Sequence, residues 1–256
     1  MNSEHYQNYD ERYDLIMNCL NIMGYSAINP GPWDLYSSSR FVEKTCKDNR
    51  IPLVSANVII PKPKRSCIKK YFIKEINGIK IGVTGISPQQ DDLRPPDKRF
   101  SIIDPKQGLN RIIPDLVKKT DFIILLSQLK TDATLEILTN FPDIDLAMCA
   151  STIPTDIRTL SDHRTMTITN RGRQIGMISI EKTKHNNITI KNKQIITLGN
   201  DIDSDPIVRD LVSAHYEQIR RQQEEKKQIE IFNKEKKFLE LTPEEFIKLY
   251  NKERKK

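Results

Sequence analysis

The sequence predicts an α/β fold in which two sheets pack as a sandwich flanked by helices, followed by a charged helical arm. Helical patterns alternate with short apolar strand patterns up to about residue 149, and from residue 165 apolar residues recur at every second position. After residue 205 the chain is helical in pattern and rich in charge. We therefore expect a main domain at residues 1–204 and a C-terminal extension at residues 205–256.

The first part of the chain is predicted to form a polar N-terminal segment, a helix and a strand. Residues 1–9 are polar, and residues 10–23 have apolar side chains at helical spacing. The expected buried face consists of Leu15, Cys19, Leu20 and Met23. We expect Gly24 to end this helix, a strand at 26–29, a rigid loop at 30–33, a helix at 39–48 and a buried strand at 53–58.

The centre of the chain carries the strongest short signal, a hairpin at residues 70–76 and 79–86 around Asn77 and Gly78. A polar, proline-rich surface loop at residues 87–99 follows, and its Asp91–Asp92 pair is expected to be solvated. Long loops in compact domains are often functional, so this loop is also a candidate for binding a partner.

Further helices and strands alternate after this loop. We expect helices at 105–118 and 131–140, each followed by a strand, at 121–127 and 144–149. The first helix would bury Leu109, Ile112, Ile113, Leu116 and Val117. Beyond residue 165, turns at 171–173 and 185–187 separate period-two segments, which predicts an antiparallel second sheet.

The C-terminal extension is predicted to be helical. Ser204 or Asp205 can cap a helix that begins at Pro206 and continues to about residue 237. A capping box of Thr242 and Glu245 starts another helix. The candidate partner-binding face of that last helix is formed by Phe246, Ile247, Leu249 and Tyr250. This face would dock on its own domain or on a partner or second copy, and both alternatives stay open.

Composition and charge limit the function classes. No run approaches the roughly 18 to 20 apolar residues of a membrane span, and the start lacks the pattern of a secretory signal, which favours an intracellular protein. The formal charge of +7 suggests an acidic partner. The basic cluster at 61–65 and 69–70 reads as a solvated loop rather than a phosphate-binding patch. Nucleic-acid binding through the basic tail is a third alternative, which the tail's near-balanced glutamate content disfavours.

The four cysteines are scattered, at positions 19, 46, 67 and 149, without a C-x-x-C pair. Their spacing is not that of a metal or haem-attachment site. We expect buried free thiols for at least Cys19 and Cys149.

The segment from Met23 to Leu35 resembles the calcineurin-like metallophosphoesterases, and within them the 5'-nucleotidase branch. In that branch an Asn and a His of this segment reach the metal pair and the phosphate. Pro32 and Trp33 stand at the matching positions here. Asp121 to Leu129 is similar to the family's strand that ends in a metal-binding His, where this chain has Gln128. Segment 144–153 is similar to the strand that ends in two His, where this chain has Ser151 and Ile153.

The resemblance extends over roughly residues 10 to 195, because segments 51–58 and 76–86 also match family segments in order. It implies a two-sheet sandwich. The family's opening Asp-x-His and Gly-Asp motifs are absent from this sequence. Two-metal hydrolysis needs a pair of ions about 3.5–4 Å apart, and neither Pro nor Trp offers a ligand. The resemblance therefore implies a pseudoenzyme without catalytic residues, metal or cofactor.

We accordingly expect a non-catalytic scaffold or assembly subunit that binds proteins through its loops and C-terminal helices. Related domains often precede a multihaem cytochrome domain and are often exported. The resemblance therefore implies subunits of a redox complex, or copies of this chain, as partners. The alternative is a metal-dependent phosphoesterase with a rebuilt site that uses Asp34, Asp145 or His163, although a lone loop His is more often simply exposed.

Overall fold

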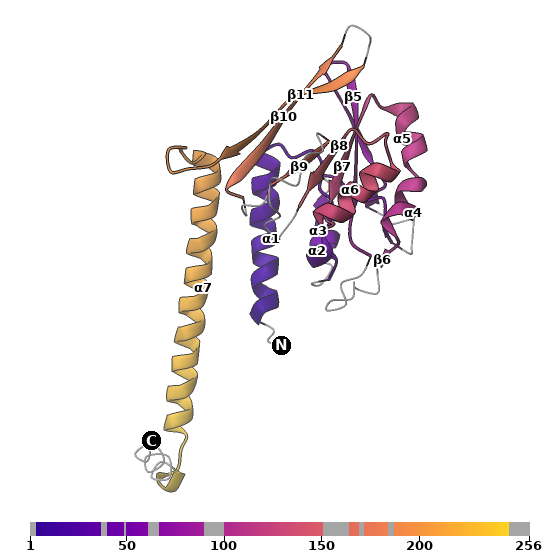
Figure 1. Ribbon diagram of the computed structural model, residues 1–256. Helices are drawn as coiled ribbons and strands as arrows, with labels where there is room; N and C mark the ends of the chain where they lie inside the picture. The colour runs from indigo at the N-terminus through magenta and orange to yellow at the C-terminus, as the bar shows by residue number, and fades with distance from the viewer. Residues whose placement is uncertain are drawn as a thin grey trace. The chain divides into compact units, whose positions relative to one another are not determined.

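The computed structural model describes residues 4–36, 40–48, 50–60, 67–89, 100–150, 164–168, 172–183 and 187–245. The chain forms two compact units, Met1–Asp203 and Ser204–Lys256. The first unit is a mixed α/β structure with one five-stranded sheet and three two-stranded sheets in its described part (Figure 1). The α/β class expected from the sequence is therefore observed.

The five-stranded sheet, which we call the main sheet, has the strand order β4-β5-β7-β8-β9. Its strands are β4 (Phe72–Ile76), β5 (Ile79–Ile86), β7 (Phe122–Ser127), β8 (Leu146–Cys149) and β9 (Thr165–Thr167). Strand β4 is antiparallel to β5, and the remaining neighbours are parallel. Asn77 and Gly78 connect β4 to β5 with positive φ angles of 51° and 77°. Because a type I′ turn needs positive φ at both central residues, the Asn-Gly hairpin prediction is confirmed.

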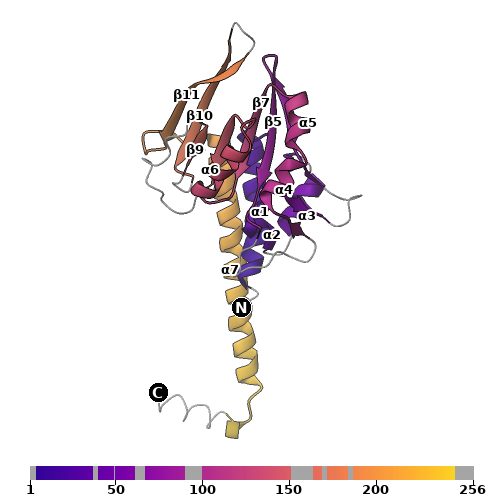
Figure 2. The same cartoon turned by 45° about the vertical axis from the view of Figure 1, so that its right-hand side comes forward.

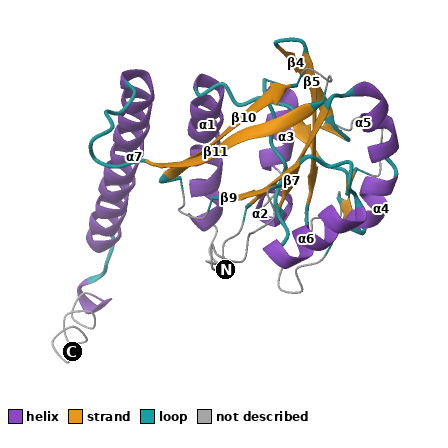
Figure 3. Ribbon diagram, turned by 45° about the horizontal axis from the view of Figure 1, so that its top comes forward, coloured by secondary structure: helices purple, strands orange, loops and turns teal. Residues whose placement is uncertain are grey.

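Helices α4 (Pro105–Asn110), α5 (Ile113–Lys119) and α6 (Thr131–Asn140) pack against the main sheet (Figures 1 and 3). Their buried residues Leu109, Leu116 and Leu138 are fully enclosed with Leu125 of β7. The single helix expected at 105–118 is two helices, because proline at the start of α5 cannot donate the backbone hydrogen bond that a continuous helix needs. Val117, which was expected on the buried face, is 45% exposed.

The N-terminal helix α1 (Glu4–Ile22) begins earlier than the polar composition suggested. Its buried face contains Tyr13 and Met17, which pack with Ile51, while Met23 is 57% exposed. Of the expected face, Met23 was therefore wrong, whereas Leu20 packs against this cluster and Leu15 and Cys19 are half-buried. Met23 follows the last helical residue, so it leaves the helical stripe that contacts the domain.

Short elements follow α1. The strand expected at 26–29 is reduced to one parallel bridge between Ile28 and Leu53. The loop expected at 30–33 includes the start of a short helix, α2 (Pro32–Tyr36), and α3 (Arg40–Asp48) occupies the predicted helix at 39–48. The predicted strand at 53–58 is two strands. Strand β1 (Leu53–Val54) pairs in parallel with β3 (Ile68–Lys69), and β2 (Val58–Ile59) pairs antiparallel with β6 (Ser101–Ile102).

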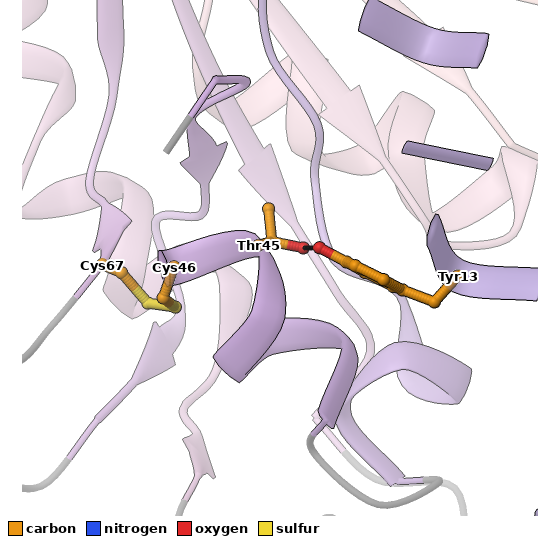
Figure 4. Close-up of a disulfide and its surroundings, with 4 residues drawn as sticks. All are labelled: Tyr13, Thr45, Cys46 and Cys67. Carbon is orange, nitrogen blue, oxygen red and sulfur yellow. Dashed lines mark hydrogen bonds between the residues drawn. A yellow bond between two sulfur atoms is a disulfide. The ribbon is translucent and has the colours of Figure 1, made fainter. Parts of the chain in front are cut away.

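A disulfide joins Cys46 of α3 to Cys67, with a Cα–Cα distance of 5.3 Å (Figure 4). On the preceding residue, the Thr45 hydroxyl lies 2.6 Å from the hydroxyl of Tyr13, which links α3 to α1. Cys19 and Cys149 are free, and Cys149 is buried. The expectation of buried free thiols thus holds for Cys149, whereas Cys19 is free but only half-buried. Nothing in the sequence spacing had singled out the Cys46–Cys67 pair.

The period-two region from residue 165 differs from the expected antiparallel sheet. Strand β9 is a parallel edge strand of the main sheet. Among the described residues after 165, the antiparallel pair is β10 (Gln174–Lys182) with β11 (Ile188–Thr197), which form a separate ribbon (Figure 2). Alternating apolar residues indicate a half-buried strand without specifying its neighbour, so the pattern could not distinguish these pairings.

The second unit contains helix α7 (Pro206–Leu239). The Asp205 carboxylate accepts hydrogen bonds from the amides of Ile207 and Val208 at 2.9 and 3.0 Å, so Asp205 is the cap. The capping box is also present, because the Glu245 amide donates to the Thr242 hydroxyl and the Thr242 amide donates to the Glu245 carboxylate. The predicted partner-binding residues Phe246, Ile247, Leu249 and Tyr250 lie outside the described residues. Within the described part of the chain, no helix has the length and apolar character needed to cross a membrane.

Candidate functional site

The candidate site lies at the carboxyl end of the parallel strands, where ligand sites gather in α/β sheets. Asn29 enters this edge from the loop before α2 and is only 7% exposed. Its side-chain Nδ2 donates to the carbonyl oxygens of Ile86 and Leu126, at 2.9 and 3.0 Å. Asn29 therefore ties the loop to the ends of both β5 and β7.

The Oδ1 atom of Asn29 is buried and has no hydrogen-bond partner among the described residues. Because Nδ2 already donates to two carbonyl groups, the orientation of the carboxamide is fixed by its contacts. A buried acceptor without a donor costs about 1–3 kcal/mol.

Asp34 belongs to the same loop and organises its turn. Its Oδ2 accepts a hydrogen bond of 2.8 Å from the amide of Gly31. Burial raises the pKa of Asp34, and the hydrogen bond from Gly31 opposes that rise. Pro32 and Trp33 open helix α2, and the side chain of Trp33 lies outside the described residues. The Asp34 carboxylate is therefore engaged within its own loop.

Gln128 follows β7 and meets the loop directly. Its amide donates to the carbonyl of Ile86 at 3.0 Å. An ideal Cβ on Gly31 would lie 3.4 Å from both Cδ and Oε1 of Gln128, which is ordinary contact distance. The glycine backbone thus packs against this carboxamide. The structure brings the predicted position Gln128 next to Gly31, which directly precedes the predicted position Pro32.

A second buried asparagine, Asn57, is hydrogen-bonded to Ser87, which in turn contacts the loop. Asn57 is completely buried, and its Nδ2 donates to the carbonyl oxygens of Ser87 and Ile103 at 2.7 and 2.9 Å. Its Oδ1 accepts from the Ser87 amide at 3.0 Å and from the Ser55 hydroxyl at 3.3 Å. The Ser87 hydroxyl in turn donates to the carbonyl of Pro30 at 2.7 Å. This network continues from the core to the loop.

The ends of β7 and β8 carry small polar groups. The hydroxyls of Ser127 and Thr134 are 2.7 Å apart, and the Leu129 amide donates to the Ser127 hydroxyl. Burial raises the pKa of the Cys149 thiol, and the hydroxyls of Thr134 and Thr167 oppose that rise. The raised pKa favours a protonated and therefore unreactive Cys149 thiol at neutral pH.

Asp145 does not join this edge. It precedes β8, and its Oδ2 accepts a hydrogen bond of 2.7 Å from the amide of Ile123 near the start of β7. Burial raises its pKa. Asp34 and Asp145 thus lie at opposite ends of the parallel strands, so the structure does not bring together these two candidates for a rebuilt metal site. His163, Ser151 and Ile153 lie outside the described residues.

The described ranges contain no group of three or more His, Cys, Asp and Glu side chains that could hold a metal ion. The side chains that do meet at the edge are carboxamides, hydroxyls and one carboxylate. Sequence reasoning had not assigned structural roles to Asn29, Asn57 and Ser87. The available signal was a polar residue inside an otherwise apolar buried stretch, as in Ser55-Ala56-Asn57.

No protein-family model matches the chain, and no curated protein matches it. Solved structures do match. A 5'-nucleotidase precursor from Thermus thermophilus aligns with a TM-score of 0.67 at 15% identity, over 84% of this chain and 47% of that one. The NAD nucleotidase of Haemophilus influenzae aligns with a TM-score of 0.64 at 17% identity, over 82% and 53%. A sulfate thiohydrolase from Thermus thermophilus aligns with a TM-score of 0.60 at 14% identity, over 78% of this chain and 38% of that one.

The TM-scores establish a shared fold, and at these identities they establish the fold alone, since one fold hosts many functions. The chain spans about half the length of the two nucleotidases. The similarity to 5'-nucleotidases implied by its sequence is therefore seen in three dimensions, at low sequence identity: this chain has the fold of the nucleotidase domain.

Proposed function

We propose that the chain is a non-catalytic scaffold or assembly subunit, built on a degenerate phosphoesterase domain of the 5'-nucleotidase branch. The observation that carries the proposal is the proximity of Gln128 to Gly31, where an ideal Cβ on the glycine would lie 3.4 Å from the Gln128 carboxamide. By the resemblance, Gln128 stands where the family has a metal-binding His, so in our proposal an amide side chain replaces that ligand beside the loop. A neutral carboxamide is a poor transition-metal ligand.

The internal bonds of the loop support the same proposal. Asp34 holds the Gly31 amide, and Asn29 holds two strand carbonyl groups. Both side chains serve the local structure. In our proposal the small sheets and the β10–β11 ribbon represent the second layer of a two-sheet sandwich.

The binding role is assigned to the second unit. Helix α7 exposes large apolar side chains, of which Ile229 is 59%, Phe232 65% and Leu239 86% exposed. Their spacing of three and seven residues places them on one side of a helix. Exposed apolar surface of this kind is typical of interaction sites. The partners are a protein subunit, including those of a redox complex, or another copy of this chain.

The experiment compares the full chain with the full-length variant Ile229→Glu/Phe232→Glu. Copies of the chain are detected by sedimentation, and partners from native extract are identified by mass spectrometry with quantitative comparison. The control variant Gln218→Glu/Asn233→Glu adds the same charge at exposed polar positions of α7. We expect the apolar-face variant alone to lose association. Equal association of all three proteins would contradict the assignment to α7.

A further inference from the structure

A pocket lies at the end of the main sheet opposite to the candidate site. Its volume is about 500 Å³, within the range of about 300–1,000 Å³ typical of small-molecule sites. Residues 188–193 of β11 form one wall, and residues around the starts of β7, β8 and β9 form the other. Its lining includes the cations Arg164, Lys191 and Lys193 and the apolar residues Pro142, Ile188 and Ile190.

The wall formed by β11 is anchored to the main sheet. Gly176 of the paired strand β10 packs so closely on β9 that an ideal Cβ would lie 2.5 Å from Sδ of Met166 and 2.7 Å from Cδ1 of Ile168. The ammonium group of Lys193 donates to the carbonyl of Thr165 at 2.9 Å. The glycine and the lysine thus fix the ribbon beside the pocket.

Strand β11 carries an irregularity within the pocket wall. Ser179 pairs with Asn192, and the next residue Ile180 pairs with Ile190, so Lys191 is an extra residue in the ladder. Bulges of this kind redirect a side chain and are frequent next to functional sites. Six consecutive residues of β11 line the pocket although neighbouring side chains in a strand point to opposite faces. The pocket therefore runs along the edge of this strand.

The charges of the lining favour an anion. Three cations, Arg164, Lys191 and Lys193, face one carboxylate, Asp145, whose Oδ2 already accepts the Ile123 amide. Outside the lining, Glu181 lies 3.0 Å from the ammonium group of Lys191, and both side chains are about half exposed or more. Such exposed pairs contribute little, so a bound anion can compete for Lys191.

Most of the remaining lining residues are apolar, and Thr189 and Asn192 are the uncharged polar ones. Pro142, Ile188 and Ile190 provide surface beside the cations, and Phe122 and Ile144 are buried beneath it. A ligand with an apolar body and an anionic head would use both parts of this surface. A phosphate monoester carries about −1.5 to −2 charge near neutral pH, which suits a lining with three cations and one carboxylate.

We propose that this pocket binds an organic phosphate ester, with its phosphate group at Lys191, Lys193 and Arg164 and its apolar body against Ile188, Ile190 and Pro142. The site is separate from the edge that carries Asn29 and Gln128. It involves binding without any chemical step, and it does not depend on the scaffold role of α7.

The test uses 1-naphthyl phosphate as the probe in calorimetric titration of the full chain. Inorganic phosphate is the control that carries only the anionic group of the probe, and 1-naphthol is the control that carries only its apolar ring system. We expect saturable binding of the probe with one site per chain, at least about tenfold tighter than either fragment. Failure of the probe to saturate the chain in the millimolar range overturns the proposal.

Charge reversal locates the binding. Lys191→Glu changes an exposed side chain of the wall and should weaken probe binding about tenfold or more. Lys182→Glu makes the same change at an exposed position of β10 outside the lining, and it should leave the affinity unchanged. Equal affinities of the two variants would show that the probe binds elsewhere and would overturn the assignment. Arg164→Gln provides an independent check from the opposite wall, with weaker binding expected.

Discussion

The side chain of Asn29 occupies the space that a side chain at position 85 would need. An ideal Cβ on Gly85 would lie 2.3 Å from Cγ of Asn29, far below contact distance. Gly85 belongs to β5, and the carboxamide of Asn29 crosses it to reach the carbonyl groups of Ile86 and Leu126. The absence of a side chain at Gly85 is therefore a condition for the loop to reach the end of the sheet.

Gly85→Ala should destabilise the chain by about 1–3 kcal/mol, because overpacking forces Asn29 from its place. Denaturant unfolding measures the effect. Gly31→Ala is the matched control, since its Cβ would meet Gln128 at 3.4 Å and should cost much less. If Asn29 is the clashing group, Asn29→Ala should reduce the cost of Gly85→Ala in a double-mutant cycle. Additive effects would argue against this contact.

Asn57→Ala should destabilise the chain by about 2–4 kcal/mol. The substitution leaves the Ser87 amide and the carbonyl groups of Ser87 and Ile103 without their buried partner, at about 1–3 kcal/mol for each unsatisfied group before relaxation. Asn187→Ala, at an exposed position, should be close to neutral. Thermal and denaturant unfolding both report the difference, and similar effects of the two changes would contradict the role given to Asn57.

Asp34→Asn should stabilise the chain increasingly as the pH rises. The folded pKa of Asp34 is raised above 3.8 by burial, so its contribution to stability is complete below that value and is lost as the pH rises through the folded pKa. The amide oxygen of Asn can still accept the Gly31 hydrogen bond. Melting temperatures of the variant and the original chain, measured from about pH 4 to 7, check the prediction.

Asp115→Asn provides a comparison in which the pH dependence of stability has the opposite sign, because the pKa of Asp115 is lowered in the folded chain. Hydrogen bonds from Lys119 and Tyr71 lower the pKa of Asp115, so its contribution is present above 3.8 and is lost as the pH falls through the folded pKa. The melting temperature of Asp115→Asn should therefore approach that of the original chain in acid. Parallel pH profiles for the two variants would refute the environment assigned to Asp34.

Reduction of the Cys46–Cys67 disulfide should destabilise the chain by about 3 kcal/mol in the chain-entropy account. The bond closes a segment with a sequence separation of 21. A reductant should lower the melting temperature of the original chain and of Cys19→Ser. It should have no such effect on Cys46→Ser/Cys67→Ser, which identifies the bond responsible.

The same disulfide gives a prediction about the compartment. Disulfides persist chiefly in oxidising compartments. We therefore predict an oxidised Cys46–Cys67 pair in the chain isolated from its native source, in contrast to the intracellular expectation from the N-terminal sequence. Differential alkylation followed by mass spectrometry measures the oxidation state. Two reduced thiols under native isolation would favour an intracellular chain.

Local sequence signals predicted the parts of the fold whose geometry is set by neighbouring residues. Asn77-Gly78 determined a turn, Asp205-Pro206 started α7, and the apolar run at 122–126 formed β7. Pairing partners were less predictable. The parallel placement of β9 and the separate β10–β11 ribbon depend on contacts between distant segments, which a period of two does not encode.

The candidate site was predictable to a similar extent. The resemblance predicted Gln128 and the loop at 30–33 at one sheet edge, and in the structure an ideal Cβ on Gly31 would lie 3.4 Å from Gln128. The bridging roles of Asn29 and Asn57 were not predicted, because each depends on carbonyl groups more than 25 residues away in the sequence. The sequence also grouped Asp145 with Asp34 as alternative ligands, although the direction of β8 separates them.

Metal stoichiometry tests the central proposal, a non-catalytic domain, most directly. The purified full chain is dialysed against Zn²⁺, Mn²⁺ and Fe²⁺ in turn, under anaerobic conditions for iron, and bound metal is counted by mass spectrometry. Gln128→His is prepared as a comparison that restores one imidazole at the sheet edge. The proposal predicts no stoichiometric metal on the original chain. Two bound equivalents of a transition metal, with hydrolysis of a phosphate ester, would contradict it.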